Sequence, residues 1–459
     1  MNKLISLKKL SKIVNGILIG GNNIKILHYS INSKKIKKNC MFIAIHGKKL
    51  DGHFFINEAI KNGALAILVE KFVNVNIAQI IVFDTILALG KIGLWKRTKF
   101  NNNPVIGITG SSGKTSVKEM TISILKKKYK VIFTKKNMNN HIGIPLTLLD
   151  FTNKYQCAVI EIGGNQINDI TYTSSLVKPN IALINNISES HLQGFKSLKN
   201  IIKCKSNIFN YLTNQGTAIV NYDDNNQKKI LKKLINNCNI LTFSLYNKKT
   251  DFFTKNIKIL PNKIRFILIS PIGEILIRLF LIGGGIHNIS NALASAALSF
   301  SIGCSLDEIA NGLKYFRSIQ GRMYPIIIDN NKLLINDTYN ANPNSVNIAI
   351  NILKNFKGTK ILVIGDMLEL GKYTLFYHKK IKNLILQTNI DYIFSFGKYS
   401  KYITENNINA QHFLNKKTLI NKLFLIIKKL KNYTILFKGS RNNKMEILID
   451  ILLEKLKCY

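Results

Sequence analysis

Short apolar runs alternate with helical patterns of apolar and polar residues along most of the chain. Apolar runs of four to eight residues predict strands, and apolar residues at helical spacing between them predict helices. The expected strands are at 40–45, 64–69, 105–108, 158–162, 181–184, 361–364, 392–396 and 434–437. This alternation favours parallel, doubly wound sheets, whose ligands bind beyond the carboxyl ends of the strands.

Chain length and one polar run divide this pattern into three parts. The chain has 459 residues, and roughly 150 residues per domain gives about three domains. The run Asn-Asn-Asn-Pro at 101–104 is typical of a linker, because Asn and Pro favour turns. We predict an α/β protein with an N-terminal α/β domain at 1–102, a central parallel-sheet domain at 103–317 and a C-terminal Rossmann-like domain at 318–459.

Composition narrows the possible functions. A hydrophobic content of 46% excludes a disordered or fibrous protein. Lys+Arg number 66 and Asp+Glu 24, so the net charge is 66 − 24 = +42. The lysines are scattered among many Ile and Asn, and we attribute them to A/T-rich codon usage. An ATPase acting on nucleic acid needs basic and aromatic residues clustered on one face. We find no such cluster and expect no nucleic-acid partner.

The sequence gives no sign of membrane insertion or export. The most apolar stretch, 264–286, is broken by Glu274, Arg278 and a glycine triplet, whereas a membrane helix needs about 20 apolar residues. The N-terminal 21 residues lack the pattern of a signal peptide. The six cysteines are scattered without a C-x-x-C pair, which indicates free thiols. We therefore expect a cytoplasmic protein that does not bind membranes.

The strongest chemical signal is the glycine-rich turn after the strand at 105–108. Residues 109–116 read T-G-S-S-G-K-T-S and contain G-x-x-G-K-T, although Ile108 stands where the longer G-x-x-x-x-G-K-[ST] pattern has its first glycine. Backbone N–H groups in such a turn bind phosphate, the lysine reaches the terminal phosphates, and the following hydroxyl binds Mg²⁺. The turn predicts a nucleoside-triphosphate site containing Lys114 and Thr115.

Isolated polar residues lie near the ends of the following strands. Glu161 closes an apolar run, and a buried acid must be paired or metal-bound, so we expect it to hold the metal. His191 follows the next strand. Taken alone, His191 is more typical of a surface or hydrogen-bonded core histidine, and Lys205 of a solvated helix lysine.

Together, these residues match a known family. The sequence closely resembles the Mur ligases of peptidoglycan synthesis, through eight strings in the family's order. The strings are at 110–120, 139–145, 191–195, 287–292, 321–322, 337–343, 365–371 and 438–441. The string at 339–343, Tyr-Asn-Ala-Asn-Pro, is typical of the members that add D-alanyl-D-alanine to UDP-N-acetylmuramoyl-tripeptide.

The resemblance implies an ATP-dependent amide ligase that uses Mg²⁺ and forms an acyl phosphate. The residues implied for ATP are Gly110, Ser111, Ser112, Gly113, Lys114, Thr115, Ser116, Asn291, Arg322 and Asp337. Among these, Asn291 matches the adenine contact, Asp337 the ribose contact and Arg322 a phosphate-facing arginine. The implied metal ligands are Thr115, Glu161, His191 and, as a carbamate, Lys205. The implied catalytic residues are Lys114, Glu161, His191, Lys205 and Arg322.

The resemblance also implies where the other substrates bind. The implied substrate-binding residues are Gly47, Asp51, His53, Asn139, Asn140, Tyr339, Asn340 and Asn342. The first three match the uridine-diphosphate site, and the last three would lie toward the incoming dipeptide. We expect a monomer in which a hinge near 316–322 brings Arg322 onto ATP.

Some positions depart from the family pattern. Asn32-Ser33-Lys34 stands where the family has acid-x-Arg, and a lysine cannot form the two parallel hydrogen bonds that arginine gives a phosphate. His141 replaces an acid, and Ser206-Asn207 replace Gly-Glu.

Several alternatives follow from the sequence. An enzyme degraded at its sugar site is one. A sibling Mur ligase or a folylpolyglutamate synthase would share the ATP residues but lack the string at 339–343. A non-catalytic binding module would lack Lys114, Glu161 or His191, all of which are present.

Overall fold

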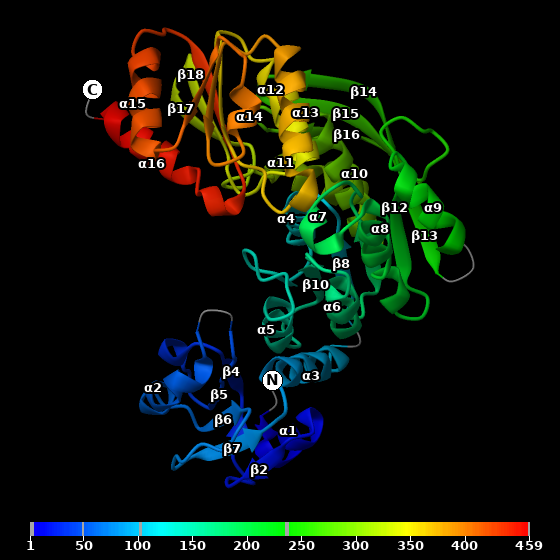
Figure 1. Cartoon of the computed structure of the whole chain (residues 1–459). Helices are drawn as coiled ribbons and strands as arrows, with labels where there is room; N and C mark the ends of the chain where they lie inside the picture. Colours follow the sequence, from blue (N-terminus) through cyan, green and yellow to red (C-terminus); the bar gives the residue numbers. More distant parts are fainter. Residues whose placement is uncertain (1–3, 48–49, 101–102, 235–237, 458–459) are drawn as a thin grey trace.

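The computed structural model describes residues 4–47, 50–100, 103–234 and 238–457. Its sheets form three α/β units in chain order, with the N-terminal unit at one end of the molecule (Figure 1). The expected domain boundaries stay predictions, and residues 101–102 of the expected linker lie outside the described residues.

The N-terminal unit is built on a five-stranded sheet of order β2-β7-β6-β5-β4, in which only β2 is antiparallel to its neighbour. Its strands are β2 (Ile17–Ile19), β4 (His28–Ser30), β5 (Cys40–Ile43), β6 (Ala66–Val69) and β7 (Ala78–Ile81), beside the two-stranded pair β1 (Ile5–Ser6) and β3 (Lys25–Ile26). Its helices are α1 (Leu7–Val14), α2 (Ile56–Lys61) and α3 (Thr85–Thr98).

The central unit holds a fully parallel six-stranded sheet of order β13-β12-β11-β8-β10-β9. Its strands are β8 (Val105–Thr109), β9 (Val131–Phe133), β10 (Cys157–Glu161), β11 (Ile181–Ile184), β12 (Thr217–Asn221) and β13 (Asn239–Phe243). Its helices are α4 (Lys114–Leu125), α5 (Gly143–Leu149), α6 (Asp169–Val177), α7 (Leu192–Phe195), α8 (Leu198–Ser206), α9 (Asn225–Leu234), α10 (Ile286–Phe300) and α11 (Leu306–Tyr315). Because β8 lies between β10 and β11, the turns after these three strands open at one edge.

A small antiparallel sheet joins this unit, with strands β14 (Phe253–Leu260), β15 (Lys263–Ser270) and β16 (Gly273–Leu279). It accounts for most of the apolar stretch at 264–286, in which buried and half-buried residues alternate along β15. Among the described residues, no helix is long and apolar enough to cross a membrane. Five cysteines are free thiols, and Cys458 lies outside the described residues.

The C-terminal unit has a six-stranded sheet of order β17-β18-β22-β19-β20-β21, parallel except for β17. Its strands are β17 (Tyr324–Asp329), β18 (Lys332–Asp337), β19 (Thr359–Gly365), β20 (Tyr392–Phe396), β21 (Ala410–Phe413) and β22 (Tyr433–Lys438). Its helices are α12 (Pro343–Leu353), α13 (Thr374–Leu386), α14 (Lys401–Thr404), α15 (Lys416–Ile427) and α16 (Glu446–Lys457). All eight expected strands are present, although β5 ends at Ile43 and β6 begins at Ala66.

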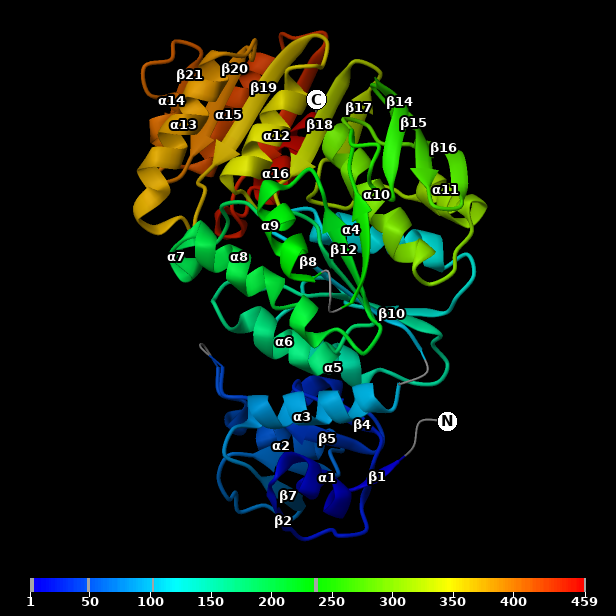
Figure 2. The ribbon, with the colours of Figure 1, turned by 90° about the vertical axis from the view of Figure 1, so that its right-hand side faces the viewer.

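Helix α3 connects the N-terminal unit to the rest of the molecule, and Figure 2 shows it lying along α5 and α6. Near its end, the Arg97 side chain is buried and donates to the carbonyls of Val177 at 2.7 Å and Lys178 at 2.8 Å, and to Asn180 Oδ1 at 3.1 Å. Val177 is the last residue of α6 and the other two acceptors follow it. One cation of the N-terminal unit therefore satisfies carbonyl groups at the end of a helix in the central unit.

We predict that Arg97→Met lowers the free energy of unfolding by roughly 3 kcal/mol, because it leaves buried carbonyl groups without their donor. Chemical denaturation of this variant and of Lys99→Met, which changes an exposed lysine at the end of the same helix, would measure the difference. Equal stability of the two variants would contradict the role given to Arg97.

Candidate active site

The turn after β8 is held in shape by the segment after β11. Ser111 N donates to the carbonyl of Asn186 at 2.9 Å, and Ser112 N donates to the Asn186 side-chain oxygen at 2.8 Å. Gly113 has φ +76° and begins α4, where an added Cβ would collide with Asn185 and Asn291. Glycine is therefore required here, and the N–H groups of the first turn of α4 are the ones oriented toward an anion.

Three cations gather around this turn. Lys114 Nζ donates to the Gly110 carbonyl at 2.7 Å, and Lys205 Nζ donates to the same carbonyl at 3.2 Å. Arg322 Nη2, from the segment before β17, donates to Thr115 Oγ1 at 2.9 Å. The arrangement places a concentrated positive charge where the sequence predicts phosphates.

Burial acts on both lysines. The pKa of Lys114 is lowered by burial and by Arg322, and Glu161 partly opposes this. Lys205 is only 1% exposed, and burial, followed by the charge of Lys114, lowers its pKa to about 7. The expectation of a solvated lysine at 205, which came from the sequence pattern alone, is therefore wrong.

Glu161 ends β10 and is 2% exposed. Its Oε2 accepts from Thr115 Oγ1 at 2.9 Å, and its Oε1 accepts from Asn139 Nδ2 at 2.8 Å. The buried Lys118 Nζ lies 3.8 Å from Oε2. A carboxylate beside a hydroxyl is an oxygen donor set of the kind that Mg²⁺ prefers, so Glu161 and Thr115 fit the expected metal.

His191 faces the C-terminal unit. Its Nδ1 lies 2.5 Å from Glu369 Oε2, and Gln193 N donates to the Glu369 carbonyl at 3.0 Å. The side-chain hydrogen bond with His191 lowers the pKa of the Glu369 carboxyl. His191 and Glu369 both have left-handed backbone, at φ +52° and +64°. Among the described residues, no three His, Cys, Asp or Glu side chains form a group that could hold a metal.

Residues after β18 form the opposite wall. The Arg322 guanidinium lies 4.1 Å from the centre of the Tyr339 ring. Asp337 accepts from Lys438 Nζ at 2.6 Å and from Met323 N at 3.1 Å. Asn342 caps α12, with its Oδ1 accepting from Ser345 N at 2.8 Å.

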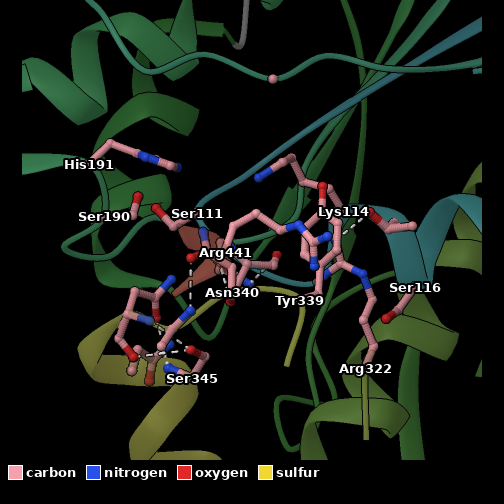
Figure 3. A pocket seen from close by; sticks show the side chains of 18 of the residues that line it. Ser111, Lys114, Ser116, Ser190, His191, Arg322, Tyr339, Asn340, Ser345 and Arg441 are labelled. Carbon is pink, nitrogen blue, oxygen red and sulfur yellow. Dashed lines mark hydrogen bonds between the residues drawn. The ribbon is translucent and has the colours of Figure 1, made fainter. Parts of the chain in front are cut away.

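These two walls enclose a cleft of about 600 Å³ between the central and C-terminal units (Figure 3). Of the residues predicted for catalysis, ATP, metal and dipeptide, those lining it are Ser111, Ser112, Gly113, Lys114, Thr115, Ser116, Asn139, Asn140, Glu161, His191, Asn291, Arg322, Asp337, Tyr339, Asn340 and Asn342. Asn291 Oδ1 accepts from Asn185 Nδ2 at 3.0 Å beside the turn. Lys205 reaches the turn from behind, through Gly110.

The residues predicted for uridine diphosphate lie on the N-terminal unit and outside the lining of this cleft. His53 N and Nδ1 contact Asp51 Oδ1 at 2.9 and 2.7 Å, and these bonds help lower the pKa of Asp51 to about 2. His53 Nε2 accepts from Glu70 N at 3.1 Å, so Nδ1 carries the proton. Gly47 N donates to the Leu50 carbonyl at 2.9 Å, and Lys34 is exposed.

Sequence reasoning gave no role to four cleft or near-cleft side chains. These are Lys118, Glu369, Lys438 and Arg441. Each lies inside or at the end of a string that resembles the family. The strings marked the positions, but the partners of Glu369 and Lys438, which are His191 and Asp337, are distant in the chain, so the sequence gave no signal for these contacts.

Comparison with known proteins identifies the family. Three family models match: Mur ligase family, catalytic domain, at 25–92; Mur ligase middle domain, at 108–299; and Mur ligase, glutamate ligase domain, at 321–441. A UDP-N-acetylmuramoyl-tripeptide–D-alanyl-D-alanine ligase of Buchnera aphidicola is 45% identical over 98% of both chains. The chain belongs to the Mur ligase family.

Further relatives match this Mur ligase over nearly its full length. The Escherichia coli protein of the same name is 39% identical over 99% of both chains. A crystal structure of MurF from Acinetobacter baumannii has a TM-score of 0.92 at 32% identity, covering 98% of this chain and 99% of that one. MurF from Thermotoga maritima, solved in complex with ADP, has a TM-score of 0.84 at 26% identity, covering 94% and 98%. The predicted three-unit α/β fold is confirmed.

Proposed function

We propose that this Mur ligase joins D-alanyl-D-alanine to UDP-N-acetylmuramoyl-tripeptide at the expense of ATP. The full-length relatives that carry this activity in their names support the substrates. The observation that carries the chemistry is a cleft in which the turn at 110–116, a buried carboxylate and a wall of the C-terminal unit face one another. The three reactants would meet in that cleft.

ATP would bind with its phosphates on the turn at 110–116. Lys114 and Arg322 would leave their present acceptors, the Gly110 carbonyl and the Thr115 hydroxyl, for phosphate oxygens. Asn291, beside the turn, and Asp337, on the opposite wall, would hold the adenine and the ribose. The ADP complex of the Thermotoga maritima relative supports a nucleotide in this family fold.

Thr115 and Glu161 would hold Mg²⁺, and His191 and a carbamylated Lys205 are the further candidates. The ion would supply positive charge that offsets the repulsion between two anions. The fit rests on the adjacent hydroxyl and carboxylate oxygens of Thr115 and Glu161, which lie 2.9 Å apart.

The reaction would proceed in two steps. The terminal carboxylate of the tripeptide attacks the γ-phosphorus of ATP, which gives an acyl phosphate and ADP. The amine of D-alanyl-D-alanine then attacks the acyl carbon, loses a proton and displaces phosphate. In the first step Lys114 and Arg322 would reduce the charge repulsion between carboxylate and phosphate.

The N-terminal unit would hold the nucleotide end of the second substrate. Gly47, Asp51 and His53 would bind uridine diphosphate, and the peptide would extend from there to the cleft. Asn139 and Asn140 line the cleft on the central side, and Tyr339, Asn340 and Asn342 line it on the C-terminal side, where the incoming dipeptide would bind. A monomer would contain every residue needed.

One assay tests the proposed activity. Phosphate release should require ATP, UDP-N-acetylmuramoyl-tripeptide and D-alanyl-D-alanine together, and omission of any one should abolish it. Release that continues without the dipeptide, or that glutamate supports equally well, would point to a different ligase.

Loss of the turn's lysine should remove turnover without unfolding the protein. Lys114→Ala is expected to lower the rate of phosphate release by about 10²- to 10³-fold or more, because the phosphate charge loses a preorganised donor. Fixed-time assays would measure the rate of phosphate release, and circular dichroism would show whether the variant is folded. Lys126→Ala, at the exposed end of the same helix, is the matched control and should retain the rate. Normal turnover by Lys114→Ala would refute the site.

Carbamylation of Lys205 should depend on pH through its lowered pKa. The ammonium form predominates below pH of about 7, and the neutral amine, which alone adds CO₂ and releases a proton, predominates above it. The ¹³C NMR signal of the carbamate carbon should therefore increase as pH rises through 7 at constant dissolved ¹³CO₂. The signal should vanish in Lys205→Arg and persist in Lys203→Arg, which changes an exposed lysine of the same helix. A signal that both variants retain would contradict the carbamate.

A further inference from the structure

The proposed reaction leaves one charge on the dipeptide without a partner. Only the amine of D-alanyl-D-alanine is consumed, so its terminal carboxylate enters and leaves the cleft ionised. A carboxylate taken out of water needs a cation or several hydrogen-bond donors. The cleft should therefore hold a cation on the C-terminal wall, away from the phosphate-binding turn.

The structure reduces the choice to one side chain. Among the described residues, the lysines and arginines that line the cleft are Lys114, Arg322, Lys438 and Arg441. Lys114 and Arg322 contact the phosphate-binding turn. Lys438 is 2% exposed and donates to Asp337 Oδ2 at 2.6 Å and to the Asn340 carbonyl at 3.0 Å. Arg441 remains.

Arg441 stands at the carboxyl end of β22, between β18 and β19 in the sheet. The same turn packs against the start of α12, because Ser440 Oγ contacts the Ala341 carbonyl at 3.4 Å. Figure 3 shows Arg441 among the cleft side chains together with Tyr339 and Asn340. Its position thus coincides with the wall proposed for the incoming dipeptide.

The Arg441 guanidinium can bind a substrate carboxylate with little loss of stability from its present ion pair. Its Nη1 lies 2.8 Å from Glu446 Oε1, and the Arg441 side chain is 61% exposed. The Glu446 side chain is 27% exposed, and an ion pair that water reaches contributes little to stability. Arginine has five N–H donors in a planar fork, which matches the two oxygens of a carboxylate.

We propose that Arg441 binds the terminal carboxylate of the incoming D-alanyl-D-alanine. The enzyme would thereby prefer a dipeptide whose terminal carboxylate is free over one whose terminus is neutral. This assignment rests on the proposed function. Asn342 and Ser345, at the start of α12, also line the cleft and place a helix N-terminus on the same wall. An anion is favoured at that end of a helix.

Steady-state kinetics with two matched dipeptides test the assignment. D-alanyl-D-alanine and D-alanyl-D-alaninamide differ at the terminal group, and only the first carries the negative charge there. The wild-type enzyme should show a KM for the amide about 10- to 100-fold higher than for the acid, as expected for one charge-assisted contact. Arg441→Gln should raise the KM for the acid by a similar factor and bring the two KM values together, with the KM for ATP unchanged. Arg441→Lys should recover part of the preference.

Glu446→Gln is the control for a purely structural role. It removes the ion-pair partner of Arg441 but leaves the guanidinium in place, so the preference for the acid should persist. If Glu446→Gln loses the preference as Arg441→Gln does, or if Arg441→Gln still prefers the acid, the assignment is wrong. A rise in the KM for UDP-N-acetylmuramoyl-tripeptide instead of the dipeptide would also overturn it. Failure of the wild-type enzyme to ligate the dipeptide at all would refute the proposed function itself.

Discussion

The carbonyl of Gly110 and the hydroxyl of Thr115 hold three cationic side chains around one turn of the chain. Lys114, Lys205 and Arg322 repel one another there, and the buried Glu161 provides only one nearby negative charge. Burial disfavours the charged form of both lysines, and a neighbouring cation adds to this effect, so the pKa values of both lysines fall. A polyphosphate relieves this repulsion, so the turn is a site built for an anion of high charge.

The cluster of cations at the turn also links the central unit to the C-terminal unit. Arg322 comes from the segment that leads into β17, so the third cation at the turn belongs to the opposite wall. The contact of His191 with Glu369 crosses the interface in the other direction. Apolar packing supports these polar contacts, since α7 lies against the segment at 371–373 and one buried cluster includes both Leu192 and Leu370. The proposed phosphate site and the proposed wall for the amine are therefore assembled by one set of contacts.

Sequence patterns predicted eight of the parallel strands, because runs such as that of β8 are buried on both faces and are apolar throughout. They did not predict other parallel strands, such as β9, β12 and β13. They missed the antiparallel sheet of β14–β16, whose exposed face carries charged residues such as Glu274 and Arg278. Lys114, Thr115 and Glu161 were predictable because the turn and the strand end are local features. The partnership of His191 with Glu369 was not, because 178 positions separate the two residues and only the packed units bring them together.

The asparagines show what the structure adds to a family resemblance. The resemblance marks Asn140 and Asn342 as substrate residues, yet each side-chain oxygen already accepts from backbone, from Gly143 N and Ser345 N respectively, at 2.8 Å. Backbone N–H groups can only donate, so these bonds fix which end of each amide is oxygen and which is nitrogen. The amide nitrogens are then the atoms left for a ligand. Both asparagines can therefore cap the backbone while their amide nitrogens donate toward carbonyl or carboxylate oxygens of a peptide.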